Sequence, residues 1–153
     1  MSSRSQLAPA SLPLENRIFI ALLKTADAVG QEAEQLFKSH GLTGAQYNVL
    51  RILRGAEPDG LPCRGIGDRM ISHDPDMTRL LDRMEQRRLI TRMRQTDDRR
   101  VIKTRITRDG LHLLKSLDLP VRALHKRQFR HMSAARLRTL AGILEDVRSP
   151  DLA

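Results

Sequence analysis

The sequence has 153 residues, which is enough for one domain with a buried core. Its formal net charge is +9 and its aromatic content is 3%, while a single cysteine excludes an intrachain disulfide framework. The longest apolar run, residues 18–23, is too short to cross a membrane, and residues 1–5 lack the apolar segment of a signal peptide. We therefore expect a cytoplasmic protein without a membrane partner.

The positive charge is concentrated in the later part of the chain. Residues 1–60 carry six Lys or Arg and six Asp or Glu, which sum to zero. Residues 61–110 carry thirteen against eight, giving +5, and residues 111–153 carry eight against four, giving +4. Arginine dominates between residues 61 and 110, and its planar guanidinium suits phosphates and guanine edges. This pattern favours a nucleic-acid partner, with a solvated basic surface as the alternative.

The first part of the chain is expected to hold an arm and two helices. Residues 1–13, with two prolines among Ser and Ala, are interpreted as a flexible arm. Residues 14–39 have apolar side chains at helical spacing, and Gly41 behind them suits a helix C-terminus. Thr43 and Gln46 have the spacing of a capping box, in which each side chain accepts the other residue's backbone N–H. They predict the start of a second helix.

The middle of the chain suits a helix-turn-helix. Residues 61–62 are interpreted as a short extended segment, and residues 63–70 as a short first helix. Its two glycines each cost about 1 kcal/mol relative to alanine. After a turn at residues 71–73, a second helix is expected to start with Asp74 as its N-cap and Pro75 in its first position. Its buried stripe is predicted from helical spacing: Met77, Leu80, Leu81 and Met84.

A two-stranded ribbon is predicted directly after this helix. Residues 89–94 and 101–106 contain β-forming side chains, and the polar, basic tip at residues 95–100 separates them. A helix followed by such a ribbon is the layout of a winged helix-turn-helix, in which the helix suits the DNA major groove. The expected fold class is therefore mostly α with a small β-wing.

The remaining residues are expected to form long helices. Thr107 and Ser133 suit the N-caps of two helices with apolar side chains at helical spacing. Together with the first helix they are more apolar than one small lobe needs, which favours a dimerisation region. We expect a single domain over residues 14–153. Its winged-helix lobe spans about residues 42–107, and its dimerisation helices span about residues 14–39 and 108–148.

Four segments resemble the MarR (multiple antibiotic resistance regulator) family of bacterial transcription factors. Residues 42–50 resemble its second-helix signature, residues 77–85 its recognition-helix core, and residues 89–92 its first wing strand. Residues 98–107 resemble its wing motif, Asp-x-Arg followed by a strand and a Thr. The resemblance, in order and spacing, covers about residues 15–148. It implies a homodimer that binds a palindromic operator in double-stranded DNA, a repressor of transcription released by a small-molecule effector.

The candidate DNA-binding residues lie around the second helix and at the ribbon tip: His73, Asp76, Thr78, Arg79, Arg83, Asp98, Arg99 and Arg100. For Arg79 and Arg83 the alternative is a solvated helix face with local ion pairs. Asp76 either accepts a hydrogen bond from a cytosine amino group or supports the helix dipole. Thr78 either contacts DNA or bonds the preceding turn.

The ribbon tip has its own candidates. Asp98 is expected to hold the guanidinium of Arg100 and aim it at the minor groove, where narrow A·T-rich segments concentrate negative potential. The alternative is an ion pair that serves only the turn. Arg99 is expected to contact phosphate.

An effector crevice lies, by the same resemblance, between the dimerisation helices and the DNA-binding lobe. Phe37, His40, Tyr47 and Leu114 are its candidate lining residues, suited to a small aromatic or amphipathic anion. The family's peroxide sensors typically carry their reactive cysteine in the first helix, and this chain has none there. Cys63 is therefore interpreted as a small packed thiol, although a helix N-terminus can make a thiol reactive.

Other functions find little support in the sequence. The five histidines show no i, i+4 pair and no cysteine partner at zinc spacing, so no metal or other cofactor is expected. A glycine-rich phosphate loop and a G-x-S-x-G nucleophile elbow are absent, which argues against an enzyme. The alternative function is a ligand-independent architectural protein that binds DNA through charge and shape alone.

Overall fold

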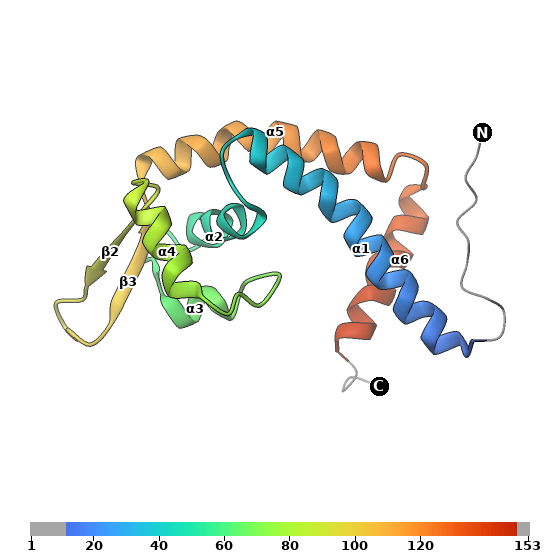
Figure 1. Cartoon of the computed structure of the whole chain (residues 1–153), viewed down its shortest axis with the longest axis horizontal. Coiled ribbons are helices and arrows are strands. Elements are labelled where there is room, and N and C mark those ends of the chain that lie inside the picture. The colour runs from blue at the N-terminus through green and yellow to red at the C-terminus, as the bar shows by residue number, and fades with distance from the viewer. Residues whose placement is uncertain (1–11, 150–153) are drawn as a thin grey trace.

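The computed structural model describes residues 12–149, so most of the arm expected at residues 1–13 lies outside the described part (Figure 1). The described chain is mostly helical with one small sheet, which confirms the predicted fold class. Its elements, in order, are α1 Leu14–Ser39, α2 Gly44–Arg54, β1 Leu61–Pro62, α3 Cys63–Gly67, α4 Met77–Gln86, β2 Ile90–Arg94, β3 Ile102–Ile106, α5 Arg108–Gln128 and α6 Ala134–Arg148.

Side-chain caps begin three of the longer helices where the sequence predicts them. Thr43 and Gln46 form both hydrogen bonds of the capping box at the start of α2. The hydroxyl of Thr107 accepts the Gly110 N–H at the start of α5, and that of Ser133 accepts the Arg136 N–H at the start of α6. Each cap satisfies a backbone donor that the first helical turn leaves without a partner.

The sheet has three strands rather than two. The ribbon pairs β2 with β3 antiparallel, from Ile90 opposite Ile106 to Arg94 opposite Ile102. β1 adds to the other edge of β3, with Leu61 opposite Thr104, so the strand order is β1-β3-β2. The added strand ties the start of α3 to the ribbon that follows α4.

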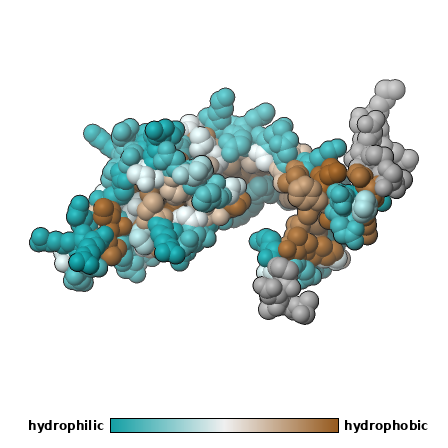
Figure 2. All heavy atoms as spheres, turned by 60° about the horizontal axis from the view of Figure 1, so that its bottom comes forward, coloured by the Kyte–Doolittle hydropathy of each residue, from teal (hydrophilic) through white to brown (hydrophobic). Residues whose placement is uncertain are grey.

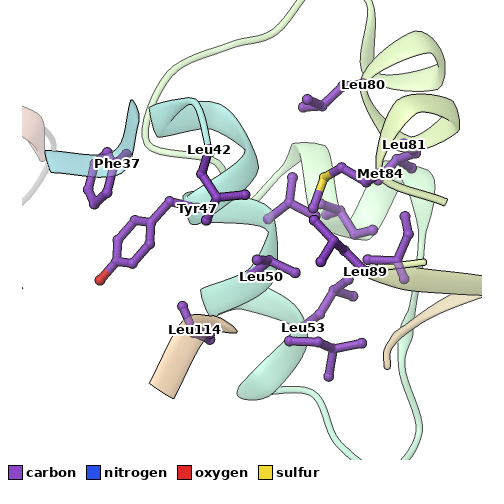
Figure 3. Packing of buried hydrophobic residues seen from close by; sticks show 14 of the residues in the cluster. Phe37, Leu42, Tyr47, Leu50, Leu53, Leu80, Leu81, Met84, Leu89 and Leu114 are labelled. Carbon is purple, nitrogen blue, oxygen red and sulfur yellow. The ribbon is translucent and has the colours of Figure 1, made fainter. Parts of the chain in front are cut away.

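The core is built around α2. Val49, Leu50 and Leu53 are fully buried and pack with apolar side chains from α3, α4, β2 and α5 (Figure 3). α2 lies between α5 on one side and the α3–α4 pair on the other (Figure 1). This arrangement turns the outer faces of α4 and α5 toward opposite sides of the lobe.

Both helices of the helix-turn-helix are shorter than predicted. α3 ends at Gly67 instead of Met70, in line with the low helix propensity of its two glycines. α4 begins at Met77, because Asp74 caps a turn instead of a helix: its Oδ1 accepts the Asp76 N–H at 2.9 Å. Asp76 is the N-cap, and the expectation that Asp74 and Pro75 start the helix was wrong.

α1 and α6 form an arm beside the lobe. Within residues 12–149, α6 has no buried residue, and α1 buries only Phe37. Seven large apolar side chains of these helices are exposed: Leu14, Ile18, Phe19, Leu23, Ile143, Leu144 and Val147. We call this set the apolar arm, and Figure 2 shows a hydrophobic region at the end of the molecule to which α1 and α6 extend in Figure 1. No helix among the described residues is long and apolar enough to cross a membrane.

Candidate nucleic-acid interface

The outward face of α4 is polar and basic. Leu80, Leu81 and Met84 bury the opposite side of the helix, so the exposed side chains of Thr78 and Arg83 are held on a fixed scaffold. Within residues 12–149, neither side chain has a hydrogen bond or an ion pair. Arg83 is thus available to an external anion, and the structure gives no support to a Thr78 bond to the preceding turn.

Asp76 has a structural part at the start of α4. Its Oδ1 accepts the Arg79 N–H at 3.1 Å, and its Oδ2 lies 3.3 Å from the Arg79 Nε. Both side chains are largely exposed, at 71% for Arg79 and 53% for Asp76, so this ion pair contributes little to stability. A phosphate can replace the carboxylate as the partner of Arg79. His73 is exposed in the loop that precedes this helix start.

The ribbon tip is shaped by Asp98, but through the backbone. Its Oδ1 accepts the Arg100 N–H at 3.0 Å, and its carbonyl accepts the Val101 N–H at 3.0 Å. Asp98 was expected to hold the Arg100 guanidinium, and this was wrong, because an Asp side chain readily bonds a backbone N–H two residues ahead. Among the described residues the Arg100 guanidinium has no ion pair. Asp98 therefore sets the turn from which Arg100 extends.

Arg99 and Arg94 lie at one shallow hollow of the tip. This hollow is lined by Arg94, Gln95, Thr96 and Arg99. A guanidinium nitrogen of Arg94 donates to the Arg99 carbonyl at 3.4 Å, while the Arg99 side chain is exposed. Two guanidinium groups beside polar side chains suit a phosphate oxygen.

A cluster of charges joins α4 to the ribbon, and the sequence analysis missed it. The Arg92 guanidinium donates to Glu85 Oε2 at 2.6 Å and to Asp82 Oδ1 at 2.6 Å. The Arg92 N–H also donates to Glu85 Oε1 at 3.0 Å. The sequence does contain a signal for this cluster, namely two acidic residues three positions apart on α4 followed by an arginine on the next strand. This cluster links α4 to β2 and so holds the helix and the wing together.

The cluster changes the titration of its members. Hydrogen bonds from Arg92 lower the pKa of the Glu85 carboxyl below its ordinary value of 4.5. The same contacts raise the pKa of the Arg92 guanidinium. Because the folded-state pKa of Glu85 is lowered, its contribution to stability is complete above pH 4.5. It is lost as the pH falls through the lower folded-state value.

Arg92→Ala is therefore expected to reduce the free energy of unfolding by about 1 kcal/mol at pH 7, since the cluster is partly exposed. The difference from the parent should shrink at a pH below the lowered folded-state pKa of Glu85, where this carboxyl is protonated in both states. Urea unfolding at both pH values measures this, with exposed Arg94→Ala on the same strand as control. An equal loss at both pH values would contradict an electrostatic role.

A buried amide holds the turn before α4. The side chain of Asn48, 8% exposed, accepts the Ile71 N–H on its Oδ1 at 2.7 Å. A buried carbonyl oxygen of this kind requires a partner, and the loop backbone supplies it. Sequence reasoning could not find this contact, because 23 residues separate its partners.

Three of the four candidate effector residues, Phe37, Tyr47 and Leu114, belong to the core cluster. The rings of Phe37 and Tyr47 stack with their centroids 4.1 Å apart, and both side chains are buried. Leu114 is fully buried below Tyr47 (Figure 3). His40 is half-buried at the edge, with its Nδ1 3.0 Å from the Leu36 carbonyl. Burial raises the pKa of the Tyr47 hydroxyl.

Cys63 is exposed, so the expected packing of its thiol was wrong. It occupies the first position of the short α3, and the buried side chain of this helix is that of Ile66. We still expect Cys63→Ser to leave DNA affinity and its response to peroxide unchanged, since no second cysteine exists in the chain to trap an oxidised thiol. Anisotropy titrations with and without peroxide measure this. Peroxide release of the parent but not of the variant would show that the thiol is a sensor.

Comparisons with known proteins agree with this geometry. The family model described as "MarR family" matches residues 42–102, from just before α2 to the first residue of β3. A homoprotocatechuate degradative operon repressor from Escherichia coli is 25% identical over 133 residues, 87% of this chain and 88% of its own. An organic hydroperoxide resistance transcriptional regulator from Bacillus subtilis is 30% identical over 110 residues, 71% of this chain and 74% of its own.

A solved structure extends the similarity to the whole fold. The crystal structure of a MarR transcription factor from Planctomyces limnophilus has 38% sequence identity and a TM-score of 0.68. The match covers 88% of this chain and 97% of that one. Relatives of this kind are transcriptional regulators, not enzymes. The chain therefore belongs to the MarR family of DNA-binding transcriptional regulators.

Proposed function

We propose that this protein is a sequence-specific repressor that binds a palindromic operator as a homodimer and is released by a small-molecule effector. The single observation that carries the proposal is the pairing of α4 with the wing. The outer face of α4 presents Arg83 without a partner among the described residues, and the wing tip presents Arg100 in the same state. The Arg92 cluster holds the two together.

The division of roles follows from this geometry. α4 is a rigid helix that suits the major groove, where arginine binds guanine edges in a bidentate manner. Arg100 extends from a narrow ribbon and suits the minor groove beside it. Arg79, Arg99, Thr78 and His73 add contacts to phosphate or bases, and Asp76 supports the helix start. The protein would act in the cytoplasm.

The apolar arm supports the homodimer. Seven exposed apolar side chains on two helices form a surface that a monomer in water does not bury. A second copy with two-fold symmetry would cover this surface and present two copies of α4 to DNA. A two-fold dimer then reads a palindrome, one half-site for each lobe. In this proposal residues 14–153 form one domain, with a lobe at about 42–107 and dimerisation helices at about 14–39 and 108–148.

The effector is proposed to bind beside the stacked rings of Phe37 and Tyr47. Phe37 belongs to α1, Tyr47 to α2 and Leu114 to α5, so a ligand there would touch the arm and the lobe together. His40 at the edge offers a polar ring to an anionic group. The name of the E. coli relative refers to degradation of an aromatic acid, homoprotocatechuate, which favours small aromatic acids as first probes.

Selection of bound sequences from random duplex DNA tests the function, and should yield a palindrome. Specific binding should then exceed binding to random DNA by at least about 10³ at fixed salt. Addition of small aromatic acids should weaken operator binding, and Tyr47→Ala should reduce that response. A specificity ratio near one would instead support the architectural alternative.

A further inference from the structure

The outer face of α5 carries a row of positive charge that the proposed operator contacts do not use. Successive steps of three or four residues place six side chains on this face, all exposed: Arg108, His112, Lys115, Leu119, Arg122 and Lys126. At 1.5 Å per residue the row is about 27 Å long. We call it the α5 stripe.

The stripe lies opposite the buried side of its helix. Leu114, Leu117 and Val121 bury the inner side of α5 against α2 and α1. The two acids of α5 lie away from the centre of the stripe, and Asp118 is already paired with Arg54 at 2.9 Å. Throughout the described helix α5, no carboxylate therefore neutralises the stripe from its own face.

The stripe and the α4 face are separated by the thickness of the lobe. α2 packs between α5 and the α3–α4 pair, so the outer faces of α5 and α4 point to opposite sides (Figure 1). A duplex held by α4 and the wing would leave the α5 stripe in solvent.

We propose that the α5 stripe binds a second DNA duplex, so that one protein molecule bridges two DNA segments. The four cations repeat along one exposed face of α5, which suits a row of phosphates and gives affinity without sequence preference. A protein partner would need buried apolar anchors, and the stripe offers one such side chain, Leu119. The inference rests on the proposed function, since the first duplex is the operator held at α4.

The test uses the full chain and an immobilised duplex that carries the selected operator. A labelled duplex of random sequence is added, and its retention is measured at two salt concentrations. The labelled duplex should be retained on the immobilised operator only when the parent protein is present, and less of it should be retained at the higher salt concentration. The variant Arg108→Gln/Lys115→Gln/Arg122→Gln should retain at least tenfold less label while its operator affinity stays within twofold of a matched control.

The matched control is Lys24→Gln/Lys38→Gln/Arg138→Gln, which removes the same charge from exposed sites elsewhere. An equal loss of retained label in both variants would overturn the proposal. It would also be overturned if the stripe variant still retained the labelled duplex as the parent does. In the latter case the second duplex occupies the α4 face of another protomer. Retention of phosphatidylglycerol vesicles in place of DNA would also overturn the proposal.

Failure of the proposed function is a separate result. It would appear as a parent protein that shows no operator preference in the first step. In that case the role of the α5 stripe is tested by measuring the affinity of each variant for the random duplex alone. Equal affinity of the stripe variant and the matched control would overturn the inference, and weaker binding by the stripe variant would support it.

Discussion

Phe19→Asp combined with Ile143→Asp should produce a folded monomer of 17.4 kDa that binds the operator far more weakly than the parent does. The two side chains are 63% and 54% exposed and belong to the apolar arm, outside the core cluster. A carboxylate at each site would be buried without a partner in a dimer and solvated in a monomer. Because two linked half-sites act through effective concentration, loss of the dimer should weaken operator binding by about 10²–10⁴-fold.

Light scattering gives the mass and anisotropy gives the affinity, while circular dichroism checks that the helices persist. The control is Gln35→Asp with Ala135→Asp, which adds the same two carboxylates to exposed positions of the same helices. The control should remain a dimer with parental affinity. A dimeric Phe19→Asp/Ile143→Asp protein would show that the apolar arm is not the interface.

The elements that the sequence predicts best are those in which one pattern has one structural solution. Met77, Leu80, Leu81 and Met84 recur at helical spacing, and burial of the last three, with Met77 partly buried, fixes α4 against the core. Thr43 with Gln46 predicts both the start of α2 and its hydrogen bonds. In each case the partners are close in the chain, so local spacing is enough.

The features that sequence reasoning missed depend on contacts across the chain or on choices between equivalent partners. Arg92 meets Glu85 and Asp82 only after β2 folds back on α4. Asp74 and Asp76 suit an N-cap equally well, and the turn that Asp74 forms decides for Asp76. Asp98 had a guanidinium and a backbone N–H within reach, and in the structure it binds the backbone. The sequence shows which side chains can form these contacts, but the choice among their possible partners depends on the folded structure.

Arg100→Ala and Arg83→Ala should weaken DNA binding in different ways. Loss of Arg100 should affect any duplex, reduce the slope of log affinity against log salt by roughly one, and lower the preference for A·T pairs under the wing. Loss of Arg83 should cost about 1–3 kcal/mol on the operator and much less on random DNA. Anisotropy at several salt concentrations on both duplexes separates these patterns. Identical behaviour of the two variants would contradict the division between wing and helix.

Asp98 tests how the wing tip holds Arg100. Because Asp98 Oδ1 accepts the Arg100 N–H, Asp98→Ala should loosen the turn and reproduce part of the Arg100→Ala loss. Asp98→Asn keeps an oxygen that can accept the same N–H but removes the negative charge, so it should bind as well as the parent or more tightly. Simple charge repulsion from DNA instead predicts tighter binding by both variants. Tighter binding by Asp98→Ala, measured at two salt concentrations, would refute the structural role of this carboxylate, whereas weakening by Ala and not by Asn separates turn geometry from charge.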